Sequence, residues 1–407
     1  MTRTAKTAHR LRAELVDELR SKGVVYSDAV ADAFATVPRE RFIPDVMAER
    51  GLEAVYRDQA FVTKKDPRGM PLSSSSQPAL MARMLELLDL QPGLHVLEVG
   101  TGSGYNAALL AHLVGPRGRV TSIDVDSDLA RLAGRALKDS GYRVAVHVGD
   151  GREGWKESAP YDRIIVTACA DEIRRRWLEQ LKDGGLLELP LRLDPDRAAI
   201  QVIPVLQRRG DRLRSTALTS GGCMPLHAGD GGWRPPPSTL TASRSGGGKH
   251  ASLVSITGPG LSALPESAAR ELLAAALTSR RRPRSRGVIG ISSAEPPLLL
   301  LYLLQKIPAD RRLAIHSDAM LGVGLMHRRS RSLAFVSVQS PWMEAPDSRK
   351  TRAPWRLDSY GGDAAAGELE RLLGEWEAMQ AAGRQALRIV ASGSGEVLRL
   401  RFRWERP

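Results

Sequence analysis

The spacing of hydrophobic positions divides the chain into three regions. Over residues 1–70 apolar residues recur at helical intervals, which predicts helices at Arg10–Ser21 and Ser27–Ala35, with Ser27 as the N-cap of the second helix. Residues 71–193 alternate short β-branched runs with longer amphipathic segments, a pattern typical of βαβ units in a parallel sheet. We therefore expect N-terminal helices followed by an α/β domain.

The region over residues 194–407 has a looser pattern, interrupted by clusters of glycine and proline. Apolar runs predict strands at Gly287–Ile291 and Ser332–Val338, and helical spacing predicts a long helix over Gly362–Ala381. The apolar segment Pro296–Ile307 is far shorter than the ~20 residues of a membrane span, so it is expected to be a buried helix. These elements predict a folded C-terminal α+β domain.

A glycine-rich turn between a strand and a helix is the strongest chemical signal in the sequence. The strand Val96–Val99 runs into Gly100-Thr101-Gly102-Ser103-Gly104, and a helix is expected over Asn106–Val114. Glycines allow a sharp turn and close approach of a ligand to the backbone. A dinucleotide fingerprint requires glycine at position 105, where this chain has tyrosine. Glu98, two residues before the first glycine, instead resembles the pattern of S-adenosylmethionine (SAM) sites.

The next two predicted strands each end near an acidic residue suited to the rest of such a cofactor. Asp124 lies near the end of the strand Arg119–Val125, where a carboxylate can accept both ribose hydroxyls. Asp150 follows the strand Val144–Val148, in a tight turn that suits the adenine amino edge. A fourth strand is expected over Tyr161–Thr167. The expected cofactor-binding residues are Glu98, Gly100, Thr101, Gly102, Ser103, Gly104, Asp124, Val125, Asp150 and Gly151.

Residues 10–193 resemble the protein-L-isoaspartate O-methyltransferases. The resemblance is carried by the stretches SQPALMARMLELL, VLEVGTGSGYNAALLAHLVG, GDGREGW and APYDRIIVTA, with Val37–Pro44 and Tyr56–Asp58 upstream. It implies an α/β, Rossmann-like, seven-stranded SAM-dependent methyltransferase domain over residues 71–193, preceded by a helical region over residues 1–70. It also implies that SAM is converted to S-adenosylhomocysteine.

The resemblance assigns a catalytic role to a serine segment. In that family a Thr-Ile-Ser segment precedes the first helix of the domain, and its serine holds the substrate carboxylate at the methyl-transfer site. The serine corresponds to Ser76, and the preceding two positions are here Ser74 and Ser75. This substitution departs from the family's pattern and puts ordinary repair specificity in doubt. The alternative for a run of serines is a solvated loop.

The basic C-terminal extension over residues 194–407 is the second departure, because repair enzymes are expected to lack it. Together with the serine segment it resembles homologues that accompany ribosomally synthesised, modified peptides such as lanthipeptides and graspetides. That resemblance implies esterification of a specific L-aspartate in a modified precursor peptide, followed by aspartimide and then isoaspartate. The extension would then recognise the peptide.

Charge is distributed unevenly between the two halves of the chain. The net charge is +13, yet residues 1–190 carry equal numbers of basic and acidic side chains. The excess lies beyond them, in Arg280–Arg286, in Arg328–Arg331 and in the C-terminal RLRFRWERP. This favours an acidic partner, with a solvated basic surface as the alternative. Nucleic acid is not expected, because no recognisable motif accompanies the charge and aromatic residues make up only 5%.

Composition limits the remaining classes. Hydrophobic residues form 42% and charged residues 26% of the chain, as in soluble globular proteins. Cys169 and Cys223 cannot build a disulfide framework, and the polar N-terminus lacks a signal-peptide core, so a cytoplasmic location is expected. Neither cysteine has a metal-type partner at close spacing, which predicts no metal site.

Two alternatives to a dedicated peptide methyltransferase stay open. One is a general repair methyltransferase for isoaspartyl residues in damaged proteins. The other is a non-catalytic protein that presents a basic surface on a methyltransferase fold. In either enzymatic case no general base is needed, because a carboxylate is already ionised at neutral pH.

Overall fold

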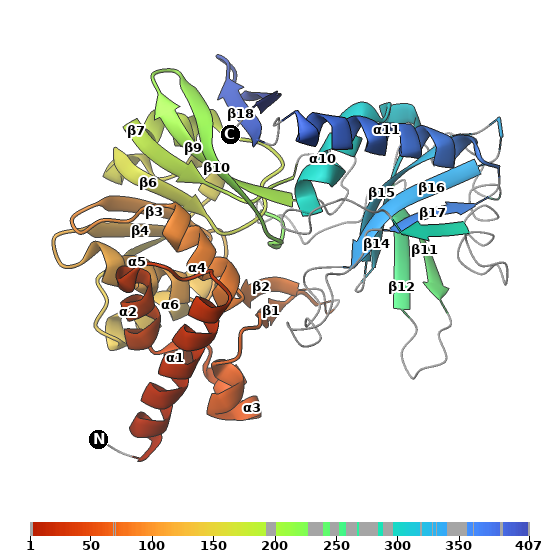
Figure 1. Cartoon of the computed structure of the whole chain (residues 1–407). Coiled ribbons are helices and arrows are strands. Elements are labelled where there is room, and N and C mark those ends of the chain that lie inside the picture. The colour runs from red at the N-terminus through yellow and green to blue at the C-terminus, as the bar shows by residue number, and fades with distance from the viewer. Residues whose placement is uncertain are drawn as a thin grey trace. The chain divides into compact units, whose positions relative to one another are not determined.

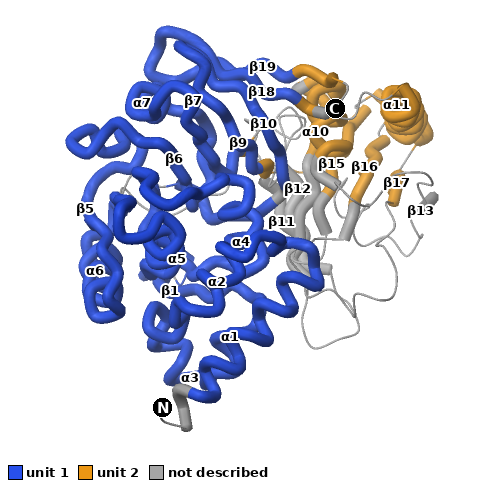
Figure 2. Tube along the Cα trace, turned by 60° about the vertical axis from the view of Figure 1, so that its left-hand side comes forward, with its two compact units in different colours: residues 1–191, 203–233, 388–402 blue, residues 192–202, 234–387, 403–407 orange. Residues whose placement is uncertain are grey.

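The computed structural model divides the chain into two compact units (Figures 1 and 2). Unit 1 comprises residues 1–191, 203–233 and 388–402, and unit 2 comprises residues 192–202, 234–387 and 403–407. The structure describes residues 3–67, 69, 71–192, 201–226, 239–244, 252–257, 267, 284–287, 296–317, 320–327, 329–330, 332–339, 356–360, 362–382 and 386–405.

The N-terminal helices of unit 1 form as expected from the sequence. Helix α1 spans Arg3–Ser21, α2 spans Asp28–Thr36 and α3 spans Pro44–Val55, with a short 3-10 turn at Arg39–Arg41. Ser27 is the N-cap of α2, and its Oγ accepts a hydrogen bond from Val30 N at 3.2 Å.

The main sheet of unit 1 contains the parallel core of a methyltransferase fold. Strands β5, β4, β3, β6 and β7 lie side by side in that order and are parallel, and β9 then pairs antiparallel with β7. With β10 they supply the seven expected strands. The strands span His95–Val99 (β3), Arg119–Asp124 (β4), Ala145–Val148 (β5), Tyr161–Val166 (β6), Leu181–Glu188 (β7), Gln201–Arg209 (β9) and Arg212–Ser220 (β10).

Three further strands extend this sheet to ten among the described residues. They are β8 (Leu191–Arg192), which pairs with β9, and β18 (Ala386–Ser392) and β19 (Arg399–Glu405), which follow β10 at the edge. A strand's free edge needs hydrogen-bond partners, and here segments far along the sequence supply them. Unit 1 is therefore assembled from discontinuous segments, unlike the consecutive regions 1–70, 71–193 and 194–407 expected from the sequence.

Helices α4 (Pro78–Leu87) and α5 (Tyr105–Val114) belong to the same hydrophobic core as α1, α2 and α3. Sheet residues from β3, β4, β6 and β9 complete this core. The other helices of unit 1 are α6 (Ser127–Asp139) and the short α7 (Arg175–Gln180). A small hairpin of β1 (Phe61–Lys65) and β2 (Pro71–Ser75) crosses the boundary that was expected at residue 70. Its second strand carries the serine segment.

Unit 2 contains a seven-stranded sheet with helices α10 and α11, which confirms the expected α+β region. Its neighbouring strands pair antiparallel, in the order β11-β12-β14-β15-β16-β17-β13. The helix expected at Pro296–Ile307 is α10, and the one expected at Gly362–Ala381 is α11. The bounds are Thr239–Arg244 (β11), Ser252–Thr257 (β12), Arg284–Gly287 (β13), Pro296–Lys306 (α10), Arg312–Ser317 (β14), Met320–His327 (β15), Ser332–Gln339 (β16), Arg356–Tyr360 (β17) and Ala364–Ala381 (α11).

One strand expected in unit 2 falls only partly within the described residues. The strand expected at Gly287–Ile291 has β13 at Arg284–Gly287 in its place, and residues 288–291 lie outside the described residues. None of the described helices is both long enough and apolar enough to cross a membrane. The same part of the chain holds no group of three or more metal-ligating side chains arranged around a common point.

Candidate functional site

The glycine loop between β3 and α5 is closed on one side by the end of β6. Gly100 has a φ of 97°, and a β-carbon built there would lie 2.4 Å from Thr167 Oγ1. Thr167 Oγ1 donates to the carbonyl of Gly100 at 2.7 Å, so the loop and the strand end are locked together. A side chain at position 100 would disrupt this contact and also adopt an unfavourable backbone conformation.

Glu98 lies beneath the loop and has no exposed surface. Its Oε1 accepts from Asn106 Nδ2 at 2.8 Å and its Oε2 from Ser122 Oγ at 2.5 Å. The Ser122 hydroxyl also lies 2.6 Å from Thr101 Oγ1. Burial raises the pKa of Glu98 to about 7, although these hydrogen bonds favour the ionised form. Glu98 thus joins the loop, the helix after it and the neighbouring strand β4.

Asp124 stands at the end of β4, and its carboxylate supports the loop from the other side. Its Oδ2 accepts from Gly102 N at 2.8 Å and its Oδ1 from Asp126 N at 3.0 Å. Burial raises its pKa, while these backbone N–H groups favour the charged form. Each carboxylate oxygen has two lone-pair directions, so both oxygens keep an acceptor direction for a ribose hydroxyl. Val125 follows directly and is half-buried.

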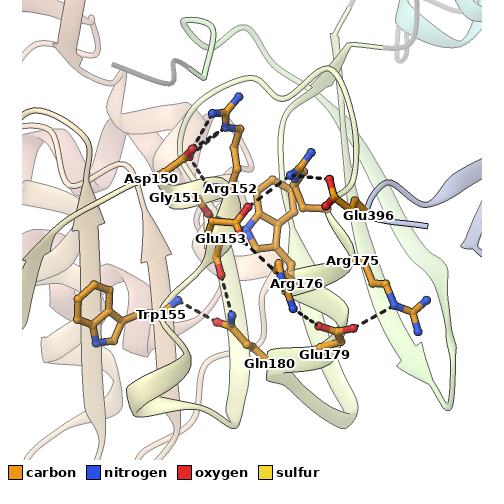
Figure 3. A network of polar contacts seen from close by, with 12 residues as sticks. Asp150, Gly151, Arg152, Glu153, Trp155, Arg175, Arg176, Glu179, Gln180 and Glu396 are labelled. Atoms are coloured by element: carbon orange, nitrogen blue, oxygen red, sulfur yellow. Dashed lines mark hydrogen bonds and ion pairs between the residues drawn. The ribbon is translucent and has the colours of Figure 1, made fainter. Parts of the chain in front are cut away.

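Asp150 follows β5 and is turned toward Arg152 in Figure 3. Arg152 Nε donates to Asp150 Oδ2 at 2.9 Å, and Arg152 Nη2 donates to the same oxygen at 2.6 Å. This pairing holds the pKa of Asp150 below its ordinary value. Gly151 is buried, and its carbonyl accepts from the indole Nε1 of Trp177 at 2.9 Å. The turn after β5 is therefore fixed by side chains of its own unit.

The serine segment lies against the glycine loop. A β-carbon built on Gly102 would lie 3.8 Å from Ser74 O and 3.6 Å from Ser73 Oγ. Side chains alternate along β2, so Ser73 and Ser75 are buried while Ser74 and Ser76 are half-buried. Half-buried Ser103 in the loop accepts from Tyr105 N at 3.4 Å. The structure thus brings the expected cofactor residues and the serine segment together.

Ser75 occupies a structural position within this segment. Its side chain is buried, and its Oγ accepts from Arg39 Nη2 at 3.3 Å. By strand alternation its hydroxyl faces away from that of Ser74. This location differs from the substrate-contacting role expected for Ser75, because the hydroxyl points into the protein rather than toward the loop.

Arg39 is the functional residue that sequence reasoning missed. Its guanidinium is fully buried and donates to the backbone carbonyls of Val55 at 3.1 Å, Arg57 at 3.2 Å, Gln59 at 3.0 Å and Ser76 at 2.9 Å. It also lies 5.3 Å from the ring centre of Phe61 and 5.7 Å from that of Tyr105. Its sequence signal was weak: the stretch Val37–Pro44 marked the region but no particular side chain.

Asp58 fixes the chain immediately after Ser76. Its Oδ1 accepts from Ala79 N at 2.8 Å, in the first turn of α4, and its Oδ2 accepts from Gln77 Nε2 at 3.2 Å. Lys22 Nζ pairs with the same carboxylate at 2.7 Å. Ser76 is thus held between the Arg39 and Asp58 contacts.

The two cysteines lie near the end of β6. Cys169 is buried, and its carbonyl accepts a hydrogen bond from Leu226 N at 2.8 Å. Burial raises the pKa of the Cys223 thiol, which opposes formation of a reactive thiolate. Neither thiol has the character of a nucleophile.

Comparison with known proteins gives one consistent match. The family model described as Protein-L-isoaspartate(D-aspartate) O-methyltransferase (PCMT) matches residues 10–227. The protein-L-isoaspartate O-methyltransferase of Methanopyrus kandleri is 40% identical over 242 residues, which cover 58% of this chain and 100% of that protein. The enzyme of the same name from Hyperthermus butylicus is 38% identical over 242 residues, covering 57% and 95%.

A solved structure extends the similarity beyond the family model. A protein-L-isoaspartate O-methyltransferase matches with a TM-score of 0.53 at 25% identity, covering 96% of this chain and 99% of that chain. The expectation that such enzymes lack the extension is therefore wrong for this relative, since the match includes most of residues 194–407.

Replacing Arg39 with methionine should destabilise unit 1 by roughly 3 kcal/mol or more, because four buried carbonyls and one hydroxyl lose their donor. Arg39→Lys should recover only part of this loss, since an ammonium cannot reach all five acceptors. Urea denaturation monitored by tryptophan fluorescence measures both effects. A loss below about 1 kcal/mol for Arg39→Met would contradict this role.

Glu98 should make stability depend on pH. Its folded-state pKa near 7 lies above the value expected for an unfolded glutamate, so folding favours its protonated form. Its favourable contribution is therefore complete at low pH and is lost as pH rises through about 7. From pH 5 to 8 the native protein should lose roughly 3 kcal/mol more stability than the Glu98→Gln variant. Parallel profiles from denaturation curves would contradict the shifted pKa.

Proposed function

Because the chain belongs to the protein-L-isoaspartate O-methyltransferase family, whose members are SAM-dependent methyltransferases, we propose that it methylates the side-chain carboxylate of isoaspartyl residues in peptides or proteins. The observation that carries this proposal is the contact of the serine segment with the glycine loop. Ser74 O lies within 3.8 Å of the position of a β-carbon on Gly102. A substrate held by the serines would therefore adjoin a cofactor held by the loop.

The residues present fit SAM. The glycine loop leaves room where a side chain at Gly100 would collide with Thr167, and Asp124 keeps acceptor directions for ribose hydroxyls. Gly104 caps α5 without a side chain, so the first-turn N–H groups face the loop region. Asp150, paired with Arg152, stays ionised as an acceptor for an adenine amino group.

When bound, SAM supplies a methyl group on sulfur: a carboxylate oxygen forms the new O–C bond as the C–S bond breaks, and the electron pair stays on sulfur. No proton is transferred, so the residues of this chain act by positioning. Ser76 would hold the carboxylate oxygen that does not react. Arg39 positions Ser76 through its carbonyl, and Asp58 positions the start of α4 beside it.

A dedicated modified peptide is the second candidate substrate. The observation that favours it is the serine pair Ser74-Ser75, which stands where the family has Thr-Ile. In this version the enzyme esterifies one L-aspartate of a lanthipeptide or graspetide precursor, and an aspartimide follows. The C-terminal extension argues less for it than the sequence suggested, because a relative of similar length carries the repair-enzyme name.

Intact-mass spectrometry with SAM should distinguish these substrates. We expect an isoaspartyl peptide to gain the mass of one methyl ester, while the same peptide with L-aspartate does not. Esterification of the L-aspartyl form only within a ring-constrained precursor would instead establish the dedicated enzyme. No mass change with any of these substrates, in a protein that binds SAM, would favour the non-catalytic alternative.

Three substitutions should separate the roles of the site residues. Ser76→Ala should lower kcat/KM by about tenfold or more, while the Kd for SAM changes less than about twofold. Ser75→Ala is the matched control, since it should lower stability through Arg39 and leave kcat/KM nearly unchanged. Asp124→Asn should weaken SAM binding about tenfold in calorimetry. Equal effects of Ser75→Ala and Ser76→Ala on turnover would contradict the assignment of Ser76.

A further inference from the structure

One face at the edge of the unit 1 sheet carries arginines on neighbouring strands. On β10, Arg212 and Arg214 are exposed, whereas Leu213 and Ser215 between them are buried. Leu213 is opposite Ala391 of β18, which is also buried. Arg212 and Arg214 therefore point to the outer face of the sheet, away from the core.

The next two strands continue this pattern. On β18, Leu387, Ile389 and Ala391 are buried, and Arg388 alternates with them on the outer face. On β19, Arg399 and Arg401 are exposed, and Leu400 between them is half-buried. We call these residues the arginine face, which consists of Arg212, Arg214, Arg388, Arg399 and Arg401.

The arginine face is poor in acidic residues. Across β10, β18 and β19 the sequence contains one, Glu405, at the last position of β19. Asp211 precedes β10 and lies 3.4 Å from Arg212, and exposed Glu396 in the loop before β19 lies 3.9 Å from Arg174. Within the described part of the chain, neither Arg399 nor Arg401 forms an ion pair.

Several arginines elsewhere in unit 1 are paired, in contrast to Arg399 and Arg401. In the network of Figure 3, Arg152 pairs with Asp150, Arg175 with Glu179, and Arg176 with Glu153 and Glu179. The unit therefore supplies carboxylates to surface arginines in that network. The outer strand β19 lacks that supply at Arg399 and Arg401, and its charge is complementary to an acidic partner.

The edge of β19 adds a second kind of complementarity. Among the described residues β19 is the last strand of the sheet order, so one side of its backbone is left for a further strand. Alternate residues of a strand lie about 7 Å apart on one face. Side chains directly opposite on a neighbouring antiparallel strand approach to about 5 Å. A peptide paired with β19 would therefore place every second side chain beside Arg399 and Arg401.

We propose that the arginine face and the edge of β19 bind an extended acidic segment of the polypeptide substrate, with Asp or Glu at alternate positions. The proposal rests on the proposed function only in taking the partner to be the substrate. Backbone hydrogen bonds supply affinity and alternate carboxylates supply selectivity. The segment lies outside the methyl-transfer site, so it holds the substrate without touching the reacting carboxylate.

Edge protection and nucleic-acid binding each account for less of the arginine pattern. Charged residues protect sheet edges from aggregation, but this need ends at β19, whereas the arginines continue onto the interior strands β18 and β10. A nucleic acid would match the charge but would not use the strand edge, and base stacking requires exposed aromatic side chains that these strands do not present at their outward arginine positions.

Fluorescence anisotropy with the full-length chain tests the proposal, using a labelled peptide with glutamate at every second position. We expect binding that Arg399→Glu with Arg401→Glu weakens at least about tenfold. The matched control, Arg135→Glu with Arg143→Glu, makes the same charge change at exposed positions elsewhere in unit 1 and should stay within about twofold of the native protein.

Three further probes distinguish the geometry from simple charge attraction. A peptide of the same composition with its glutamates in one block should bind at least about fivefold more weakly, as should the alternating peptide with N-methylated backbone amides. Equal binding of all three peptides would overturn the proposal. So would tighter binding of a single-stranded oligonucleotide, or an unchanged affinity in the Arg399/Arg401 variant.

Methyl transfer to a short neutral isoaspartyl peptide separates this inference from the proposed function. The Arg399/Arg401 variant should modify that peptide at the native rate, because the peptide does not reach the arginine face. Absence of transfer by the native protein would refute the proposed activity, while the anisotropy result would still decide whether the arginine face binds acidic peptides.

Discussion

A single buried cation, Arg39, sets the geometry on which the candidate site depends. A guanidinium without water must find acceptors for its donors, and here four backbone carbonyls from two segments supply them. Because one acceptor belongs to Ser76 and the nearby ring belongs to Tyr105, the substrate segment and the start of α5 share one reference point. A small displacement of this cation would move both halves of the site together, which keeps their separation constant.

The sequence was most informative where structure is local. The glycine loop, its flanking strand and helix, and the acidic residue ending β4 lie within thirty residues of one another, and their spacing alone predicted how they meet. Ser75 shows the limit of that reasoning: its neighbour's role could be carried over by resemblance, but the face on which its hydroxyl lies depends on strand alternation. Arg39 was beyond prediction, since its acceptors are carbonyls, which every residue possesses.

The sheet itself illustrates the same limit at a larger scale. Strands β9 and β10 were expected to belong to the extension, and β18 and β19 carried no local sign that they join the strands near residue 100. Pairing between distant segments depends on edge complementarity, which hydrophobic periodicity does not record. The excess positive charge of the second half was visible in the sequence, whereas its division between the two units and its concentration on one face of a sheet required the structure.

The placement of β18 and β19 has a consequence for how the protein is made. These strands belong to unit 1, yet they are synthesised only after residues 234–387 of unit 2. At ordinary rates of translation that intervening segment takes roughly ten to thirty seconds to emerge. During this time β10 presents an unpaired edge to the cell, so the nascent chain passes through a stage that chaperones must recognise. Cutting the gene after the methyltransferase half would make that stage permanent.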